Sequence, residues 1–437
     1  MYQCGFYESD ITPPLGCSIP GYFRKRLGED VRDRLHAKAA VISDGKTEVA
    51  ILSVDNVGFY SKIRAGIQKR VEEYTGISSS NLILCATHAH TGGSGEDRQT
   101  NGEIDALYLE MLTLLAADAV TLAKKRMQPC ALRYATGNVE GHSFVRNYRM
   151  RDGSVRTNPG WDTTDIVEAI AKPNTELPVL FAEDEEGKLI GAITNFALHN
   201  DCVAGNAYSS DYAGKLGEVL KKTYGQEFIT VFTTGFCGNI NHMDYIGKTS
   251  RNYVDIGEAL AAEVVRLAEN TEAVSGAVSA VTRRLSVKTR NVARSELDEL
   301  REFVKAYDAP TDGSVDLAYP EKIETKYRYA VNILQKYENL PPEKEVKLTV
   351  LCVGDVCFYS MPGEPFSEFR ELIKEGSPFK KYFAIEMNGS HHGYIPTKGL
   401  EETAVYEAGP ISNSLSPEAG YRMVDALLAM ASEIVSL

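Results

Sequence analysis

The sequence has no C-x-x-C motif, and its eight cysteines lie singly along the 437 residues. This scattered placement is not that of a disulfide framework or of a cysteine-based zinc site. The first residues, Met1 to Phe6, lack the basic and apolar regions of a secretory signal. We therefore expect reduced thiols in a cytoplasmic protein.

Basic residues are also fewer than acidic ones: Lys+Arg 47 against Asp+Glu 60 give a net charge of −13. Nucleic acids and anionic membranes attract basic surfaces, so the charge argues against both as partners. No stretch reads as an uncharged membrane span, and the G-x-S-x-G motif of serine hydrolases does not occur. We expect a small-molecule substrate, and the sequence leaves the oligomeric state open.

Hydrophobic residues make up 43% of the chain, which is enough for a large core. A strand at Glu48–Asp55, a helix at Ser61–Tyr74 and a strand at Asn81–Thr87 predict a right-handed crossover between parallel neighbours. The carboxyl ends of these strands carry Asp55 and His88. Ligand clefts of open α/β sheets form at such an edge, so we expect the active site there.

Strands and helices continue to alternate along the rest of the chain. Further strands are predicted at Leu132–Ala135, Leu177–Phe181, Leu189–Leu198, Phe228–Thr234, Val278–Thr289, Lys347–Val353, Val356–Tyr359 and Tyr382–Glu386. Further helices are predicted at Glu103–Arg126, Asp211–Thr223, Asn252–Leu267, Ser295–Asp308, Pro320–Tyr337 and Pro417–Ser436. No repeat or long linker divides the chain. We therefore expect one mixed α/β (α+β) domain over residues 1–437, with sheets flanked by helices and a helical decoration at about 295–340.

Three of the eight histidines follow two apolar strands. His88 and His90 lie in the segment ATHAHTGG, and His199 ends the segment TNFALHN. Imidazole is the commonest metal ligand, and in an extended H-x-H segment both rings leave on the same face. One ring can then hold a metal while the other addresses a water molecule. A single histidine in a loop is more often without a role. Two apolar strands that each run directly into histidine favour a metal site.

Three further candidates lie in the last quarter of the chain. Glu364 occupies a Pro-Gly-Glu-Pro turn, where an acid is commonly a surface or first-turn residue. Tyr394 and Tyr406 lie in a segment rich in Gly and Pro, where tyrosines often serve packing. A phenol can also bind zinc or donate a hydrogen bond to an oxyanion. The neighbouring His391 and His392 are rival metal ligands.

Together these motifs resemble the neutral/alkaline ceramidase family, specifically its N-terminal catalytic domain. The similar segments are, in chain order, SDITPP at 9–14, ATHAHTG at 86–92, NFALH at 195–199, SDY at 210–212 and PGE at 362–364. Tyr394 and Tyr406 keep the twelve-residue spacing of the two active-site tyrosines of that family. The resemblance extends over nearly the whole chain, as in a short bacterial-type homologue.

The resemblance implies a zinc-dependent hydrolase that acts on a C–N bond. It implies one zinc ion per chain, with the ligands His88, His199, Glu364 and Tyr394. It also implies His90 as the general base, and as donors to the oxyanion Arg146 and Tyr406. Zinc accepts mixed nitrogen and oxygen ligands, although ligand type alone does not separate it from other divalent ions.

Three departures from the family pattern affect the expected substrate. Asn241 stands where the family has a serine, and Arg149 competes with Arg146 for the arginine position. The immunoglobulin-like C-terminal domain of the secreted ceramidases has no counterpart in the sequence. We therefore expect a small soluble substrate, N-acyl or sugar-derived, in place of ceramide. A metal-dependent glycoside-cleaving or lyase-type enzyme and a non-catalytic binding protein are the alternatives.

Overall fold

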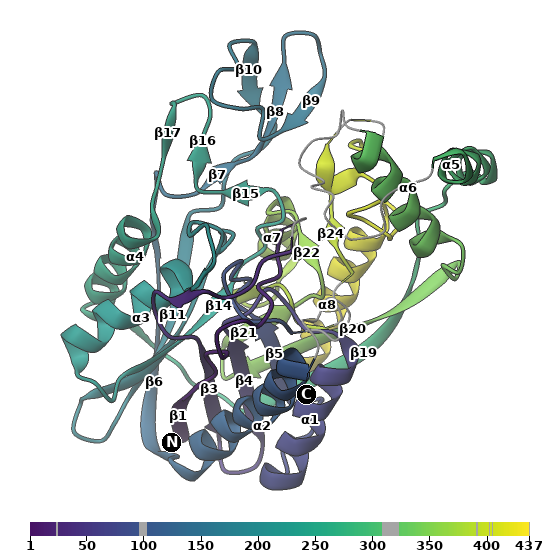
Figure 1. Cartoon of the computed structure of the whole chain (residues 1–437). Helices are drawn as coiled ribbons and strands as arrows, with labels where there is room; N and C mark the ends of the chain where they lie inside the picture. The colour runs from purple at the N-terminus through teal and green to yellow at the C-terminus, as the bar shows by residue number, and fades with distance from the viewer. Residues whose placement is uncertain are drawn as a thin grey trace.

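The structure, a computed structural model, describes residues 1–22, 25–95, 103–307, 323–389, 392–401, 403 and 405–436. These residues form the expected mixed α/β fold, in which two β-sheets pack face to face and helices cover their outer faces (Figure 1). Within the described ranges, the larger sheet has nine strands and the smaller sheet four.

The larger sheet has the strand order β14-β12-β11-β6-β1-β3-β4-β5, with β18 added beside β6. Its strands are β1 (Tyr2–Asp10), β3 (His36–Ser43), β4 (Glu48–Val54), β5 (Leu82–Ala86), β6 (Gln128–Asn138), β11 (Glu176–Glu183), β12 (Leu189–Phe196), β14 (Ile229–Thr234) and β18 (Glu272–Ala273). The pairs β4–β5 and β12–β14 are parallel, and α1 (Ser61–Thr75) and α3 (Asp211–Tyr224) connect them. The predicted strand–helix–strand unit is thus confirmed.

Two central strands, β1 and β3, were not predicted. β1 interrupts its apolar residues with Gln3 and Glu8, and β3 is rich in alanine, which has a low β propensity. Their place in the middle of the sheet comes from pairing with each other and with strands far along the chain. Local sequence pattern does not carry that information.

The smaller sheet has the order β19-β20-β21-β23. Its strands are β19 (Val278–Lys288), β20 (Glu343–Val353), β21 (Val356–Ser360) and β23 (Lys381–Ile385). The hairpin about Gly354-Asp355 is confirmed, since Val353 pairs with Val356. Apolar residues on its inner face, such as Phe358 and Phe383, pack against the larger sheet in one shared core.

Helices fill the two outer layers. α1 and α2 (Glu103–Lys125) share an apolar core with β3, β4 and β5, and α3 and α4 (Tyr253–Ala268) share one with β11, β12 and β14. α7 (Glu368–Gly376) and α8 (Ala419–Val435) cover the smaller sheet. By length and composition alone, residues 104–125 pass for a membrane span, unlike our expectation from the sequence. Half of the relevant stretch is buried within the protein, as in a core helix.

The helical decoration consists of α5 (Arg294–Ala306) and α6 (Ile323–Tyr337), which lie at the edge of the molecule (Figure 1). The Tyr337 hydroxyl fastens α6 by donating hydrogen bonds to the carbonyl oxygens of Pro410 and Asn413. The expected loop between these helices, Pro-Thr-Asp-Gly, lies outside the described residues. The assignment of residues 1–437 to one domain stays a prediction.

Short strands beyond the two sheets form small pairs and one three-stranded sheet. They are β2 (Asp30–Val31), β7 (Phe144–Val145), β8 (Asn147–Met150), β9 (Val155–Thr157), β10 (Ile166–Ala169), β13 (Ala207–Tyr208), β15 (Ile240–Asn241), β16 (Met243–Asp244), β17 (Thr249–Ser250), β22 (Glu364–Pro365) and β24 (Tyr394–Ile395), with a 3₁₀ turn η1 (Tyr406–Ala408). The pair β22–β24 bears on function, because it sets Glu364 opposite Tyr394 in parallel register.

The two edges of the larger sheet come together at the carboxyl ends of their strands. β14 and β5 stand at opposite ends of the strand order, yet the Thr234 hydroxyl of β14 donates a hydrogen bond of 2.9 Å to the carbonyl oxygen of Thr87, just past β5. The backbone N–H of Glu386, just past β23, donates to the carbonyl oxygen of Thr234. The carboxyl ends of three strands from two sheets therefore meet at one place.

Candidate metal and active site

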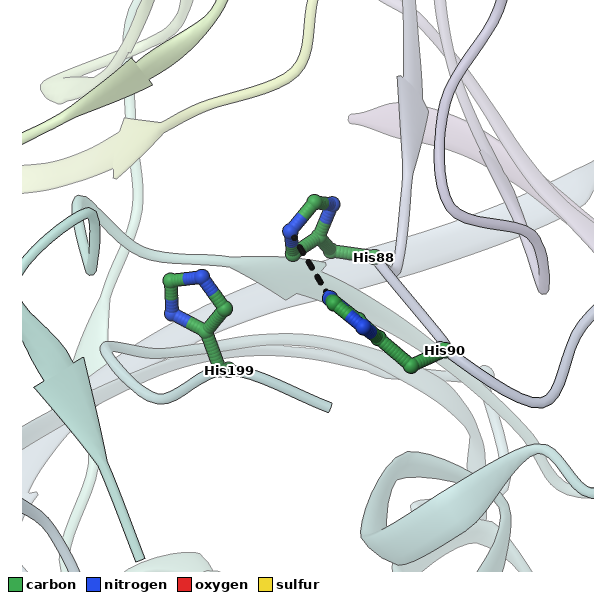
Figure 2. Close-up of side chains that lie close together, drawn as sticks. All are labelled: His88, His90 and His199. Atoms are coloured by element: carbon green, nitrogen blue, oxygen red, sulfur yellow. Dashed lines mark hydrogen bonds between the residues drawn. The ribbon is translucent and has the colours of Figure 1, made fainter. Parts of the chain in front are cut away.

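The three histidines of the strand-end segments meet at this place (Figure 2). One ring nitrogen from each of His88, His90 and His199 lies within 4.8 Å of the others, and all three side chains are buried. His88 and His90 follow β5, and His199 follows β12. This buried group can hold a metal ion.

The backbone at His88 differs from the extended H-x-H segment that we expected. β5 ends at Ala86, and His88 has a φ of 64°, in the left-handed region that non-glycine residues rarely adopt. The rings are nevertheless adjacent, with 3.3 Å between the Nε2 atoms of His88 and His90. The turn and its hydrogen bonds produce that proximity, and strand alternation does not. Strained backbone of this kind clusters at functional sites.

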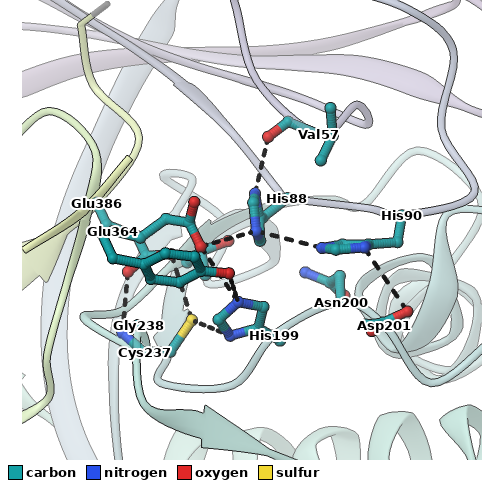
Figure 3. A network of polar contacts seen from close by, with 12 residues as sticks. Val57, His88, His90, His199, Asn200, Asp201, Cys237, Gly238, Glu364 and Glu386 are labelled. Atoms are coloured by element: carbon teal, nitrogen blue, oxygen red, sulfur yellow. Dashed lines mark hydrogen bonds and ion pairs between the residues drawn. The ribbon is translucent and has the colours of Figure 1, made fainter. Parts of the chain in front are cut away.

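The outer nitrogen of each proposed histidine ligand has a fixed partner (Figure 3). Nδ1 of His88 lies 2.7 Å from the carbonyl oxygen of Val57, which can only accept, so this nitrogen carries the proton. Nδ1 of His199 lies 3.5 Å from Sγ of Cys237. These contacts turn the Nε2 atoms of both rings inward. Partners of this kind orient metal-ligating histidines.

Glu364 and Tyr394 join His88 and His199 in an inner group of four side chains. Oε2 of Glu364 lies 3.3 Å from Nε2 of His88 and 3.3 Å from Nε2 of His199. The Tyr394 hydroxyl lies 3.5 Å from Nε2 of His199. Ligand atoms that are 2.0–2.1 Å from a tetrahedral zinc ion lie about 3.3 Å from one another. These three distances therefore fit the implied ligand set.

The three histidines of the site differ in the direction of their pKa shifts. Burial disfavours the charged form of His88, but the Glu364 carboxylate outweighs burial and raises the His88 pKa to about 9. Burial, together with the Arg146 cation, lowers the His199 pKa to about 3. Burial and the His88 charge hold the pKa of His90 well below its usual range. His90 is thus a neutral imidazole beside the inner group.

Arg146 lies at the site, whereas its rival Arg149 does not. The buried Arg146 guanidinium donates from Nε to Glu407 at 2.6 Å, and lies 5.1 Å from the centre of the Tyr394 ring. Arg149 instead forms an exposed pair with Glu168. The Tyr406 ring lies 5.6 Å from that of Tyr394 and is partly exposed. The structure thus brings both expected oxyanion donors beside Tyr394.

The remaining candidates from the sequence are Asn241, His391 and His392. The buried Asn241 donates from Nδ2 to Oδ1 of Asn158 at 2.7 Å, and its Oδ1 accepts from the Met243 backbone. Among the described residues, His392 is not part of the histidine group. His391 lies outside the described residues.

Sequence reasoning missed several buried residues that support the site. Glu407 is fully buried and accepts hydrogen bonds from the side chains of Arg146, Asn147 and Thr157. Glu386 accepts from the backbone N–H and the thiol of Cys237, and burial raises its pKa to about 8. Glu386 ends a predicted apolar strand, and an acidic residue at the end of such a strand is a sequence signal that could have marked it as a site residue.

Comparison with known proteins gives the family of the chain and agrees with its fold. The model of the neutral/alkaline non-lysosomal ceramidase N-terminal region matches residues 2–252, more than half of the chain. The chain therefore belongs to this family of hydrolases. A search among curated proteins gave no match.

Two solved structures share the fold over the whole chain. Neutral ceramidase from Pseudomonas aeruginosa has a TM-score of 0.71 and 16% identity, with 99% of this chain and 74% of that chain covered. A ceramidase complexed with C2 has a TM-score of 0.70 and 17% identity, with 100% and 75% covered. At this identity the likeness shows the fold alone.

Proposed function

We propose that this protein is a zinc-dependent hydrolase that cleaves the C–N bond of a small, water-soluble N-acyl compound. The observation that carries the proposal is the convergence of His88 and His199, through Nε2, on one carboxylate oxygen of Glu364. Together with Tyr394 these residues would hold one zinc ion per chain. When bound, zinc supplies Lewis acidity, which lowers the pKa of water toward neutrality and polarises a carbonyl group.

The residues around the ligands have matching tasks in the proposed reaction. His90 is neutral and accepts a proton from the attacking water at Nε2. Arg146 and Tyr406 stabilise the negative charge that develops on the carbonyl oxygen. The amine then leaves with the proton that His90 returns. Glu407 holds the Arg146 guanidinium in place for this task.

The rim of the site supports a polar substrate. The Asp201 side chain lies beside His90 and is 30% exposed. A long acyl chain laid over this carboxylate would remove its exposed part from water, which is costly. The proposal therefore includes a small soluble substrate. A cytoplasmic location, with neither a nucleic acid nor a membrane as partner, stays a prediction from the sequence.

A substrate panel with metal control tests this function. Purified protein is stripped with a chelator, reloaded with zinc and assayed for amine release from N-acyl amino acids, N-acetyl sugars and a short-chain ceramide, with glycosides alongside. We expect zinc-dependent release of amine from a soluble N-acyl compound. Turnover of glycosides alone would favour the glycoside-cleaving alternative, and equal activity without metal would contradict the proposal.

A further inference from the structure

The loops that carry His90 and Asp201 are tied together through their backbones. The backbone N–H of His90 donates to the carbonyl oxygen of Asn200 at 2.9 Å. The Asn200 side chain in turn donates to the carbonyl oxygen of Thr87. These bonds fix the residue after Asn200, which is Asp201, beside the His90 ring (Figure 3).

The two ring nitrogens of His90 face different surroundings. Nε2 faces the inner group, 3.3 Å from Nε2 of His88. Nδ1 is buried and makes no hydrogen bond within the described part of the chain. Its carboxylate neighbour is Asp201, with Oδ1 at 3.8 Å. A buried polar nitrogen normally has a partner, and catalytic hydrogen bonds are often long before substrate binds.

Asp201 is itself held in place for this contact. The Tyr22 hydroxyl donates a hydrogen bond to Oδ1 of Asp201. The Tyr22 ring is in turn fixed by the Arg26 guanidinium, 4.1 Å from its centre. Arg26 also donates to the carbonyl oxygen of His90, so the same side chain braces both partners.

Space on the Nδ1 side of the ring is closed by backbone. Gly21 has a φ of 104°, and a Cβ atom there would lie 2.9 Å from Nδ1 of His90. Only glycine leaves room for the ring at this distance. The His90 ring is thus confined between the Gly21 backbone and the inner group, with Asp201 at its outer nitrogen.

We propose that Asp201 is a positioning residue for His90: it accepts the Nδ1 proton and thereby keeps the Nε2 lone pair directed at the site. The role of His90 as a base rests on the proposed function, but the Asp201 contact itself does not. Carboxylates that hold the outer nitrogen of a histidine fix its tautomer and orientation. An isolated imidazole has no such constraint and distributes its proton between both nitrogens.

The tautomer of His90 tests this proposal without any substrate. Long-range ¹H–¹⁵N correlation spectra of ¹⁵N-histidine-labelled protein distinguish a protonated nitrogen from an unprotonated one, and the His90→Gln variant identifies the signals of His90. We expect a protonated Nδ1 in the wild type. Asp201→Leu should shift the proton toward Nε2, and Tyr22→Phe should give a smaller shift. Asp298→Asn, which changes an exposed carboxylate paired with Arg301, should give none.

Activity gives a second, separable readout. With a substrate from the panel, Asp201→Leu should lower kcat by roughly 10–100-fold, with a smaller effect on KM. Asp201→Asn keeps an acceptor oxygen and should recover part of the loss. An unprotonated Nδ1 in the wild type, or an unchanged tautomer in Asp201→Leu, would overturn the proposal. A tautomer shift in a protein that hydrolyses nothing would instead overturn the proposed function alone.

Discussion

Two clusters on the larger sheet combine histidine with a carboxylate, and they differ in what faces the carboxylate. At the site, Glu364 faces the Nε2 atoms of His88 and His199. In the second cluster, Glu8 of β1 lies near His36 of β3 and accepts a hydrogen bond from the ammonium group of Lys221. A cation of the protein already balances the second carboxylate. At the first carboxylate the Nε2 atoms of two histidines converge on one oxygen, an arrangement that can bind a metal ion once His88 gives up its Nε2 proton.

The largest expected effect is the loss of metal binding on removal of a ligand. His88→Ala and His199→Ala should each weaken zinc binding by more than the roughly 10–100-fold that loss of an outer partner costs. His36→Ala, in the second cluster, should leave the affinity unchanged. Competition titration with a zinc-binding dye measures all three. If His88→Ala binds zinc as tightly as the wild type, the Glu364 cluster is no more a metal site than the Glu8 cluster.

The next effect separates His90 from the ligands. His90→Gln should retain zinc but lose about 10²–10⁴-fold in kcat, since a positioned base contributes that much. Metal analysis and turnover are measured on the same preparation. If zinc is lost together with activity, His90 is a ligand, and the base must be sought elsewhere.

A third prediction compares a buried ion pair with an exposed one. Glu407→Ala leaves Arg146 charged and buried without its carboxylate, so the free energy of unfolding should fall by about 3–5 kcal/mol. Glu168→Ala removes the exposed partner of Arg149 and should cost about 0–1 kcal/mol. Urea denaturation measures both values. Similar losses in the two variants would mean that Arg146 is not held as the structure indicates.

The smallest effect concerns the second cluster and pH. Burial, together with Lys38, lowers the His36 pKa to about 4, below the 6.5 of the unfolded chain. Between these two pKa values the unfolded chain binds a proton at His36 that the folded chain does not. The free energy of unfolding therefore decreases as pH falls from 6.5 to 4. The loss attributable to His36 should be roughly 3 kcal/mol at most. His36→Gln should reduce the pH dependence of unfolding by that amount, and an unchanged pH dependence would contradict it.

The sequence predicted the parts of the site that follow local pattern. The unit Glu48–Thr87 was visible as two apolar strands about a helix, and it places His88 just past a strand end. His199 was visible in the same way. Glu364 and Tyr394 were visible as candidates, but their assignment as ligands came from the resemblance. The structure brings both to the histidines through the β22–β24 pair. Their roles as ligands stay predictions.

What the sequence could not predict depends on contacts between distant segments. The buried Glu407 is paired with Arg146, which lies 261 residues earlier in the chain. Asp201 gains its neighbour His90 through a backbone bond between two loops, and no periodicity encodes that bond. The approach of β14 to β5 likewise follows from the path of the whole larger sheet. Local patterns fix elements, but these contacts depend on how the elements pack.

The most direct test of the metal site is a crystal structure of zinc-loaded protein with anomalous scattering measured at the zinc edge. We expect one peak per chain, about 2.0–2.2 Å from Nε2 of His88, Nε2 of His199 and Oε2 of Glu364, with the Tyr394 oxygen as the fourth ligand. Nε2 of His90 should lie outside that distance. A peak absent from this place, or one held by His90 in place of Glu364 and Tyr394, would contradict the assignment.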